Sequence, residues 1–486
     1  MSETKSLKDS VASGFFWAAL SNGTQQVVMM LIGIVLARLL DEADYGMVAM
    51  LTVFTIIAAN LQEGGFYNAL AVKKEATHAD FNAVFWFNVL ASLLIYAVLF
   101  VAAPWIADFN RTPELVPLGR VLFLGFVISS VGTAQAAWLF RHLKVREKTS
   151  SQVMASLFSG VVGLGAAFSG AGCWSLVAMD LSYKAAYVAL VWHFSPWRPT
   201  WSMDLRPAFA MFGFGSRLLL TNLLTMLNHQ LLQTLLGHFY PAGRVGQYSQ
   251  ANKWNTMGCT LLTGMVGSVA QPALAQVNEE EGRQLRIFRK MLRFTAFFSF
   301  PALLGLGLIA PEFIRLTIGD KWMESVPYLQ ILCVAGAFIP LNQMFSNLLV
   351  SKGASGAYLA SASGFLLCQL IAVVGLHPMG IKGLLYAVSG LNVIWLFVWF
   401  AIVRRRVGMR LLDLLSDIVP FLVLALLALM VAGWVATWVP EGVGSLLLKL
   451  MVAAGLYVLL MHVSGAEIWK ECLMFVQSKL RRHKTQ

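Results

Sequence analysis

Long apolar segments, separated by short polar links, recur along the whole chain. Residues 85–103 carry no charge and only one Asn and one Ser, and residues 421–439 carry no charge and a single Thr. Each is long enough to cross the hydrocarbon core of a bilayer as a helix, which takes about 20 residues. The pattern predicts fourteen such helices and no soluble domain, at residues 14–38, 47–70, 83–104, 115–140, 152–170, 174–195, 209–237, 246–275, 291–313, 325–350, 356–376, 380–403, 418–438 and 445–463.

Composition agrees with an all-α polytopic membrane protein. Of the 486 residues, 58% are hydrophobic and only 12% are charged, whereas soluble domains carry about 25% charged residues. The first apolar segment reads as a retained span rather than a cleaved signal. Acidic and basic residues mix in its flank, and the polar run 21–26 interrupts it.

The basic residues alternate between links, and this alternation predicts orientation. With the N-terminus in the cytoplasm, 25 of the 36 Lys and Arg residues fall in cytoplasmic segments. The opposite links hold Arg111, Arg244, Arg315, Lys321 and Lys382. Both termini are therefore predicted to be cytoplasmic. The net charge of +12 is then a topology signal with affinity for anionic lipid rather than a nucleic-acid footprint.

A weak internal repeat appears at an offset of 200 residues. Asn22 matches Asn222 and Gly46 matches Gly246, and the remaining identities are leucines. Parallel repeats of this kind occur in transporters. The repeat predicts two six-helix lobes, 1–200 and 201–405, followed by 406–486 with two further helices and a basic amphipathic tail along the cytoplasmic surface.

Polar residues within the spans predict a cavity, because a polar side chain in a membrane must face protein or water. On the span 209–237 one helical face carries Arg217, Thr221, Asn222, Thr225, Asn228, His229 and Gln233. Lys253 lies in the first turns of the next span, and the first span adds Asn22, Gln25 and Gln26. Interhelical hydrogen bonding is the competing interpretation. The candidate substrate-binding residues are Arg217, Lys253, Asn22, Gln25, Gln26, Asn222, Asn228 and His229, with the two cations suited to phosphate.

Other charged positions have plainer interpretations. Asp180 and Lys184 are spaced for an i, i+4 ion pair. Asp180 and Glu63 are also the candidates for holding a coupling ion. The run from Asp413 to Asp417 is expected to be interfacial. Five cysteines without ligand spacing, and no catalytic motif, predict no metal site, no cofactor and no enzyme.

Ordered short motifs give the chain a family resemblance. They include 36–40 (Leu-Ala-Arg-Leu-Leu), 69–74 (Ala-Leu-Ala-Val-Lys-Lys), 84–88 (Val-Phe-Trp-Phe-Asn), 246–249 (Gly-Gln-Tyr-Ser) and 319–322 (Gly-Asp-Lys-Trp). The chain resembles the Wzx-type polysaccharide transporters of the multidrug/oligosaccharidyl-lipid/polysaccharide exporter superfamily. Residues 41–45 depart from the family's usual Gly-Pro at a surface turn.

The resemblance implies two six-helix lobes working by alternating access in the bacterial inner membrane. The implied substrate is an undecaprenyl-pyrophosphate-linked oligosaccharide, flipped from the cytoplasmic to the periplasmic leaflet for surface polysaccharide. The implied partners are that lipid-linked oligosaccharide, membrane lipids and, as a further candidate, the polysaccharide polymerase machinery. Three alternatives stay open: a cation-coupled drug exporter of the same superfamily, a membrane-bound polymerase or ligase, and a scaffold that transports nothing.

Overall fold

The computed structural model describes residues 26–63, 70, 76–142, 144–209, 228, 230–276, 281–352, 354–466 and 468–471. Within these ranges every regular element is a helix, as the sequence predicts. The chain forms two compact units, Met1–Gly246 and Gln247–Gln486. This boundary differs from that of the predicted lobes 1–200 and 201–405, which stay a prediction.

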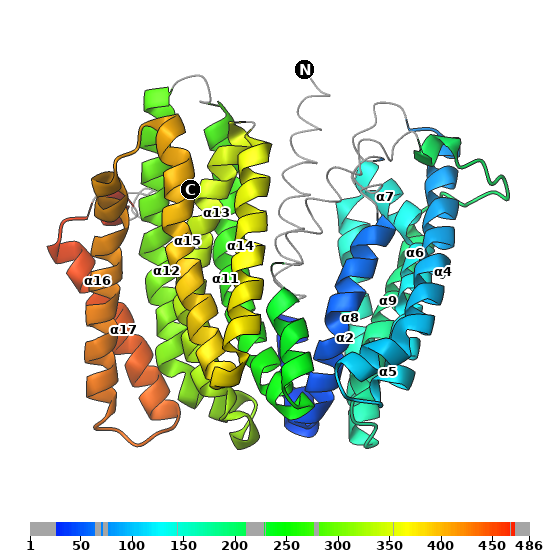
Figure 1. The fold of residues 1–486 in the computed structure, drawn as a ribbon, viewed down its shortest axis with the longest axis horizontal. Coiled ribbons are helices and arrows are strands. Elements are labelled where there is room, and N and C mark those ends of the chain that lie inside the picture. The colour runs from blue at the N-terminus through cyan, green and yellow to red at the C-terminus, as the bar shows by residue number, and fades with distance from the viewer. Residues whose placement is uncertain are drawn as a thin grey trace, which may run out of the picture. The chain divides into compact units, whose positions relative to one another are not determined.

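Unit 1 is built from helices that pack around α9 (Trp174–Phe194) and α4 (His78–Phe109). Helix α8 (Val145–Phe168) lies along α9 (Figure 1). The other members are α2 (Glu42–Glu63), α5 (Leu115–Leu122), α6 (Leu124–Ser130) and α7 (Thr133–Arg141). The start of α4 is fixed locally, because Thr77 and Asp80 hydrogen-bond each other's backbone amides in a capping box.

Unit 2 has α12 (Glu281–Thr317) at its centre, in contact with α13 (Ser325–Ser351), α16 (Leu411–Ala436) and α17 (Val443–Val463). Helix α15 (Gly380–Val407) packs on α13, and α14 (Ser355–Leu376) packs on α15. Short 3₁₀ turns, η1 (Asp320–Trp322) and η2 (His377–Met379), precede α13 and α15. Helix α11 (Ala242–Gln276) begins in unit 1 and continues into unit 2.

Large apolar side chains cover the outside of these helices. Trp105 on α4 is 69% exposed, Val161 on α8 71% and Met451 on α17 65%. By contrast, α13 is largely buried, with Leu341, Phe345 and Leu348 in the core of unit 2. Exposed apolar surface on this scale requires a lipid environment rather than water.

By length and composition, eight described helices can cross a membrane, or nine if the bent segment 115–141 counts as one. Helices α9 and α11 are absent from this set, although the sequence analysis predicts spans there. Both are long enough, at 21 and 35 residues, but both carry polar and charged residues. The fold is that of a polytopic helical membrane protein.

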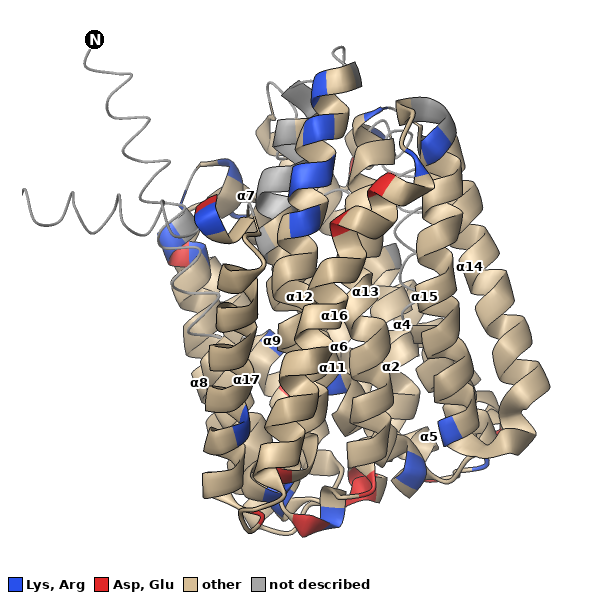
Figure 2. Cartoon of the chain, turned by 90° about the vertical axis from the view of Figure 1, so that its left-hand side faces the viewer, with Lys and Arg blue, Asp and Glu red and all other residues tan. Residues whose placement is uncertain are grey.

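Within each unit, the links that contact each other are ones predicted to lie on the same side of the membrane. At one end of unit 1, Arg141 donates to the carbonyl of Leu70 (2.9 Å) and Asn82 donates to that of Ser202 (2.5 Å). At one end of unit 2, Arg315 pairs with Glu441, which joins two links predicted to be periplasmic. In Figure 2 one helix carries Lys or Arg on several consecutive turns at its upper end, and both signs of charge occur at the upper as well as the lower ends.

The predicted single span 115–140 is wrong in one respect, because this segment breaks into α5, α6 and α7. A bend of 41° separates the segment 115–130 from 133–141. Gly132 stands at the bend, where an added Cβ would lie 2.8 Å from Val188. Broken helices within a membrane protein occur where the backbone is buried in protein or lines a cavity.

Candidate functional site: a cationic cavity in unit 1

A cavity of about 540 Å³ opens beside the broken segment of unit 1. Five helices of this unit contribute to its wall: α2, α6, α7, α8 and α9. The lining combines two cations with aromatic rings, amides and hydroxyls, namely Thr55, Ile56, Ala59, Phe126, Ser129, Gly132, Thr133, Ala136, Lys148, Gln152, Tyr183, Lys184 and Tyr187.

Lys184 is held in the cavity wall by two features. Its Nζ lies 2.5 Å from Oδ2 of Asp180, one helical turn earlier on α9. Opposite it, α6 has Gly125, where an added Cβ would lie only 2.6 Å from the ammonium nitrogen. The absence of a side chain at residue 125 therefore makes room for the cation. The predicted ion pair between Asp180 and Lys184 is confirmed.

Lys148 is the second cation of the wall, in the first turn of α8. Its Nζ lies 5.3 Å from the centroid of the Phe140 ring, in a cation–π arrangement. The two lysines come from different helices, and Asp180 pairs with Lys184. The wall of the cavity therefore presents two cations.

Two tyrosines complete the wall on α9. The rings of Tyr183 and Tyr187 stack at 6.2 Å between centroids with planes 5° apart. Aromatic faces with hydroxyl edges present apolar area together with hydrogen-bonding groups. With the amide of Gln152 and the hydroxyls of Thr55 and Ser129, the lining suits a ligand that carries both hydroxyl groups and negative charge.

The predicted binding residues are described only in part. Asn22, Gln25, Arg217, Asn222 and His229 lie outside the described residues, and only the backbone of Glu63 is described. Gln26 begins the described chain with an exposed side chain, and Asn228 is half-buried. Their grouping in one cavity stays a prediction.

Lys253 lies in unit 2, in the polar first third of α11. Its Nζ lies 6.0 Å from the centroid of the Trp254 ring. Around it Gln247, Gln250 and Asn255 are buried, and Gln247 donates to the carbonyl of Lys321 at 2.8 Å. The polarity predicted for this helix is thus present, and one of these amides holds the link before α13.

The sequence did not predict site residues at Tyr183, Tyr187, Gln152 or Ser129. A signal was available: this part of the chain combines the ion pair with glycines at 125 and 132 and hydroxyls at 129 and 133. Those residues lie on different spans, and no spacing rule joins spans whose packing is unknown.

Comparison with known proteins gives the chain its family. A family model described as "Polysaccharide biosynthesis protein" matches residues 35–327, more than half of the 486 residues. The chain belongs to this family. The matched range of the polysaccharide biosynthesis family contains the whole cavity of unit 1, from Thr55 to Tyr187.

Curated relatives match over most of their length. The teichuronic acid biosynthesis protein TuaB of Bacillus subtilis is 26% identical over 413 residues, which cover 84% of this chain and 83% of that protein. The lipopolysaccharide biosynthesis protein WzxC of Escherichia coli is 28% identical over 361 residues, which cover 71% of each.

Solved structures share the fold. The lipid II flippase MurJ in an inward closed conformation superposes with a TM-score of 0.73 at 12% identity, over 93% of this chain and 99% of that one. An inward-facing multidrug resistance MATE family transporter of the MOP superfamily gives a TM-score of 0.64 at 17% identity, over 79% and 94%. The transporter fold implied by the sequence resemblance is confirmed.

Proposed function

We propose that this protein is a flippase that moves an undecaprenyl-pyrophosphate-linked oligosaccharide from the cytoplasmic to the periplasmic leaflet by alternating access. The product serves a surface polysaccharide, such as an O-antigen, a capsule or an exopolysaccharide. Family membership and the flippase-like fold support this class of function. The observation that carries the proposal is the cationic, tyrosine-lined cavity of unit 1.

The cavity suits the polar part of such a substrate. A pyrophosphate brings more than one negative charge into a space of low dielectric, where an unpaired charge is very costly. Lys148 and Lys184 offset that cost as point charges that release phosphate more readily than a bidentate arginine. Tyr183 and Tyr187 offer ring faces to sugars. In this proposal Arg217 and Lys253 remain further phosphate contacts, and Asp180 and Glu63 remain candidates for ion coupling.

An apolar groove of unit 2 suits the polyprenyl chain. The groove encloses about 900 Å³ between α11, α12, α16 and α17, with Leu261, Pro301 and Leu450 in its wall. The one charged side chain in its lining, Lys449, is neutralised by Glu312 at 2.6 Å. Neither residue was predicted from the sequence to have a role. An isoprenoid chain in this groove would exchange lipid contacts for protein contacts.

Filling the groove tests this assignment. Ala454→Trp places a large ring in the groove and should slow polysaccharide export severalfold, measured as surface polysaccharide per amount of membrane protein. Leu459→Trp adds a ring on the same helix at a position 55% exposed and outside the groove. We expect that control to export normally. Equal export by both variants would contradict a role for the groove.

The drug-exporter alternative is disfavoured by charge. A cationic drug is attracted by carboxylates, whereas the cavity of unit 1 has lysines in its wall. Cells that express the protein should therefore accumulate cationic dyes as the deletion strain does. A drop in dye accumulation on expression would favour drug export.

The function is tested directly in a strain that lacks the gene. We expect lipid-linked oligosaccharide to accumulate on the cytoplasmic leaflet, and a plasmid copy to restore surface polysaccharide. Normal polysaccharide in the deletion strain would contradict the proposal. The proposal includes association with the polysaccharide polymerase, which co-purification after crosslinking would test.

Localisation in the inner membrane with both termini cytoplasmic is also part of the proposal. Reporter fusions after Lys148 and Lys290 should read cytoplasmic, and one after Arg111 should read periplasmic, because basic residues concentrate in the first set of links. A periplasmic signal after Lys290 would overturn this orientation.

A further inference from the structure

The loop that follows α9 is held against the first turns of α4. Three side chains spaced one turn apart on α4 contact it: His78, Asn82 and Trp86. Asn82 donates Nδ2 to the carbonyl of Ser202 at 2.5 Å, and its Oδ1 accepts from the amide of Thr200 at 2.8 Å. Trp86 donates Nε1 to the carbonyl of Thr200 at 2.7 Å. The backbone of the loop is therefore fixed on both sides of residue 201.

A buried tryptophan fixes the earlier part of the same loop. Trp197 is only 8% exposed, and its ring lies 5.8 Å from that of Phe81 and 6.1 Å from that of Phe85. Its Nε1 donates to Nδ1 of His78 at 3.1 Å. Because the loop is already ordered by these contacts, a surface that it presents can bind without a further loss of conformational freedom.

The surface that this loop presents is the ring of Trp201. Trp201 is 86% exposed, and its ring centroid lies 5.3 Å from that of Trp86, with the two planes 37° apart. Met203, two residues later, is 54% exposed. A tryptophan combines a large apolar ring with one N–H donor, which suits a boundary where one side is apolar and the other is wet.

The outer face of α4 leads from this pair of rings along the lipid-facing surface. Leu94 and Val101 lie on the same helical face as Trp86 and are 67% and 62% exposed, and Trp105 ends this face with 69% exposed. Residues 86 and 105 are 19 positions apart, which is roughly 28 Å along a helix. The hydrocarbon core of a bilayer is about 30 Å thick. Trp86 and Trp201 are therefore at one boundary of the hydrocarbon and Trp105 is at the other, where tryptophan is enriched in membrane proteins.

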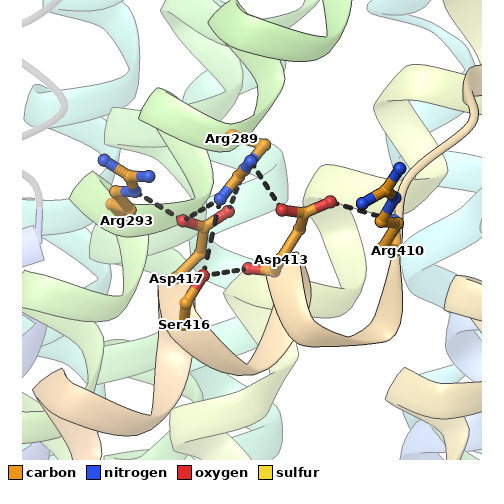
Figure 3. Close-up of polar contacts among 6 residues, drawn as sticks. All are labelled: Arg289, Arg293, Arg410, Asp413, Ser416 and Asp417. Atoms are coloured by element: carbon orange, nitrogen blue, oxygen red, sulfur yellow. Dashed lines mark hydrogen bonds and ion pairs between the residues drawn. The ribbon is translucent and has the colours of Figure 1, made fainter.

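At one end of unit 2 the side chains bind to each other instead (Figure 3). Asp417 on α16 has no exposed side-chain surface. Arg289 on α12 places Nε 2.7 Å from Oδ2 of Asp417 and pairs with Asp413 at 2.8 Å, and Arg293 places Nε 2.5 Å from Oδ1 of Asp417. The run 413–417 was predicted to be interfacial, which is wrong for Asp417, because α12 covers it. This cluster joins two helices of one unit, whereas most of the Trp201 ring remains outside its own unit.

We propose that residues 195–202 form an interfacial anchor, which α4 holds through Asn82 and Trp86 and which inserts Trp201 into the boundary between headgroups and acyl chains. The occupant of this surface is the bilayer lipid itself, because the ring continues the lipid-facing side of α4. The anchor fixes the depth of unit 1 in the membrane, and it is separate from the cavity that takes the transported substrate.

Photo-crosslinking of the full-length protein in cell membranes tests the anchor. Benzoylphenylalanine at residue 201 should form phospholipid adducts, detected by mass spectrometry, with a yield similar to that at the lipid-facing residue 94. Asn82→Ala releases the loop and should lower the yield at residue 201 severalfold. The yield at residue 94 in the same variant should not change, which shows that the protein is still folded. A full yield at residue 201 in Asn82→Ala would overturn the rigid anchor.

The identity of the adduct decides between occupants. A protein adduct at residue 201 would overturn the proposal in favour of a partner subunit, and no adduct there, with normal adducts at residue 94, would mean that the ring faces water.

Tryptophan emission gives a second measurement in vesicles of phosphatidylcholine brominated near the top of the acyl chain. Trp201→Phe should lose part of the emission that these lipids quench. Trp254→Phe removes a tryptophan that is 5% exposed within unit 2, and it should leave the quenched part unchanged. An equal quenched part in wild type and Trp201→Phe would contradict the anchor.

Discussion

Replacing Lys148 and Lys184 together with glutamine should abolish surface polysaccharide while the protein remains in the membrane. A hydrogen bond to a charged group contributes about 1.5–3 kcal/mol, which corresponds to roughly tenfold to a hundredfold in affinity. Losing two such contacts to a pyrophosphate removes most of the attraction that the cavity offers. Polysaccharide should be measured at the cell surface and divided by the amount of membrane protein.

Matched variants separate substrate contact from folding. Lys144→Gln removes a cation one turn before Lys148, at a position outside the cavity, and should export normally. Asp180→Asn removes the partner of Lys184 but keeps its charge, and should export at least in part. If Asp180→Asn loses membrane protein as Lys184→Gln does, the ion pair is structural. Wild-type export by the double lysine variant would exclude the cavity as the phosphate site.

The helices could be predicted from the sequence because the length of each apolar segment sets the length of the helix it forms. Segments such as 325–350 and 445–463 match α13 and α17 within a residue or two at each end. Apolar periodicity did not predict the bend at Gly132, where the chain lies close to Val188 on another helix. The sequence shows that a glycine is present but not what lies opposite it.

The sequence predicted the charge of the ligand better than it predicted which residues lie together around it. Arg217 and Lys253 indicated an anionic ligand from the sequence, whereas Lys184, which lies in a cavity wall, was predicted only as half of an ion pair. Its neighbours Tyr183 and Tyr187 look like ordinary interfacial aromatics in the sequence. The burial of Asp417 could not be predicted either, because the side chains that bond to it, Arg289 and Arg293, are more than a hundred residues away in the sequence.

The repeat at an offset of 200 has a structural counterpart in unit 1. An added Cβ on Gly46 would lie 1.8 Å from the carbonyl oxygen of Ala242, and one on Gly246 would lie 1.8 Å from that of Glu42. The two contacts are reciprocal, since Glu42 and Ala242 are themselves 200 residues apart. The starts of α2 and α11 therefore cross with backbone against backbone. Only glycine allows this approach, which explains why glycine occurs in both copies.

Gly246→Ala should therefore destabilise the protein, whereas Gly243→Ala, three residues earlier on the same helix, should stabilise it. Alanine is favoured over glycine within a helix by about 1 kcal/mol, and a Cβ at residue 243 meets open space. At residue 246 the obstacle is backbone, which has no rotamer to yield, and overpacking of this kind costs about 1–3 kcal/mol or more. Thermal unfolding of the purified variants in detergent would show opposite shifts in Tm.

Because the two glycine contacts are reciprocal, a variant that carries both substitutions gives a further prediction. Once Gly46→Ala has pushed the two helix starts apart, the second Cβ at residue 246 meets a carbonyl that has already moved. Gly46→Ala combined with Gly246→Ala should therefore cost less than the two single substitutions added together, as expected for residues that share one contact. Additive losses would mean that the two glycines act independently, and a Gly246→Ala protein as stable as Gly243→Ala would show that the close crossing is absent.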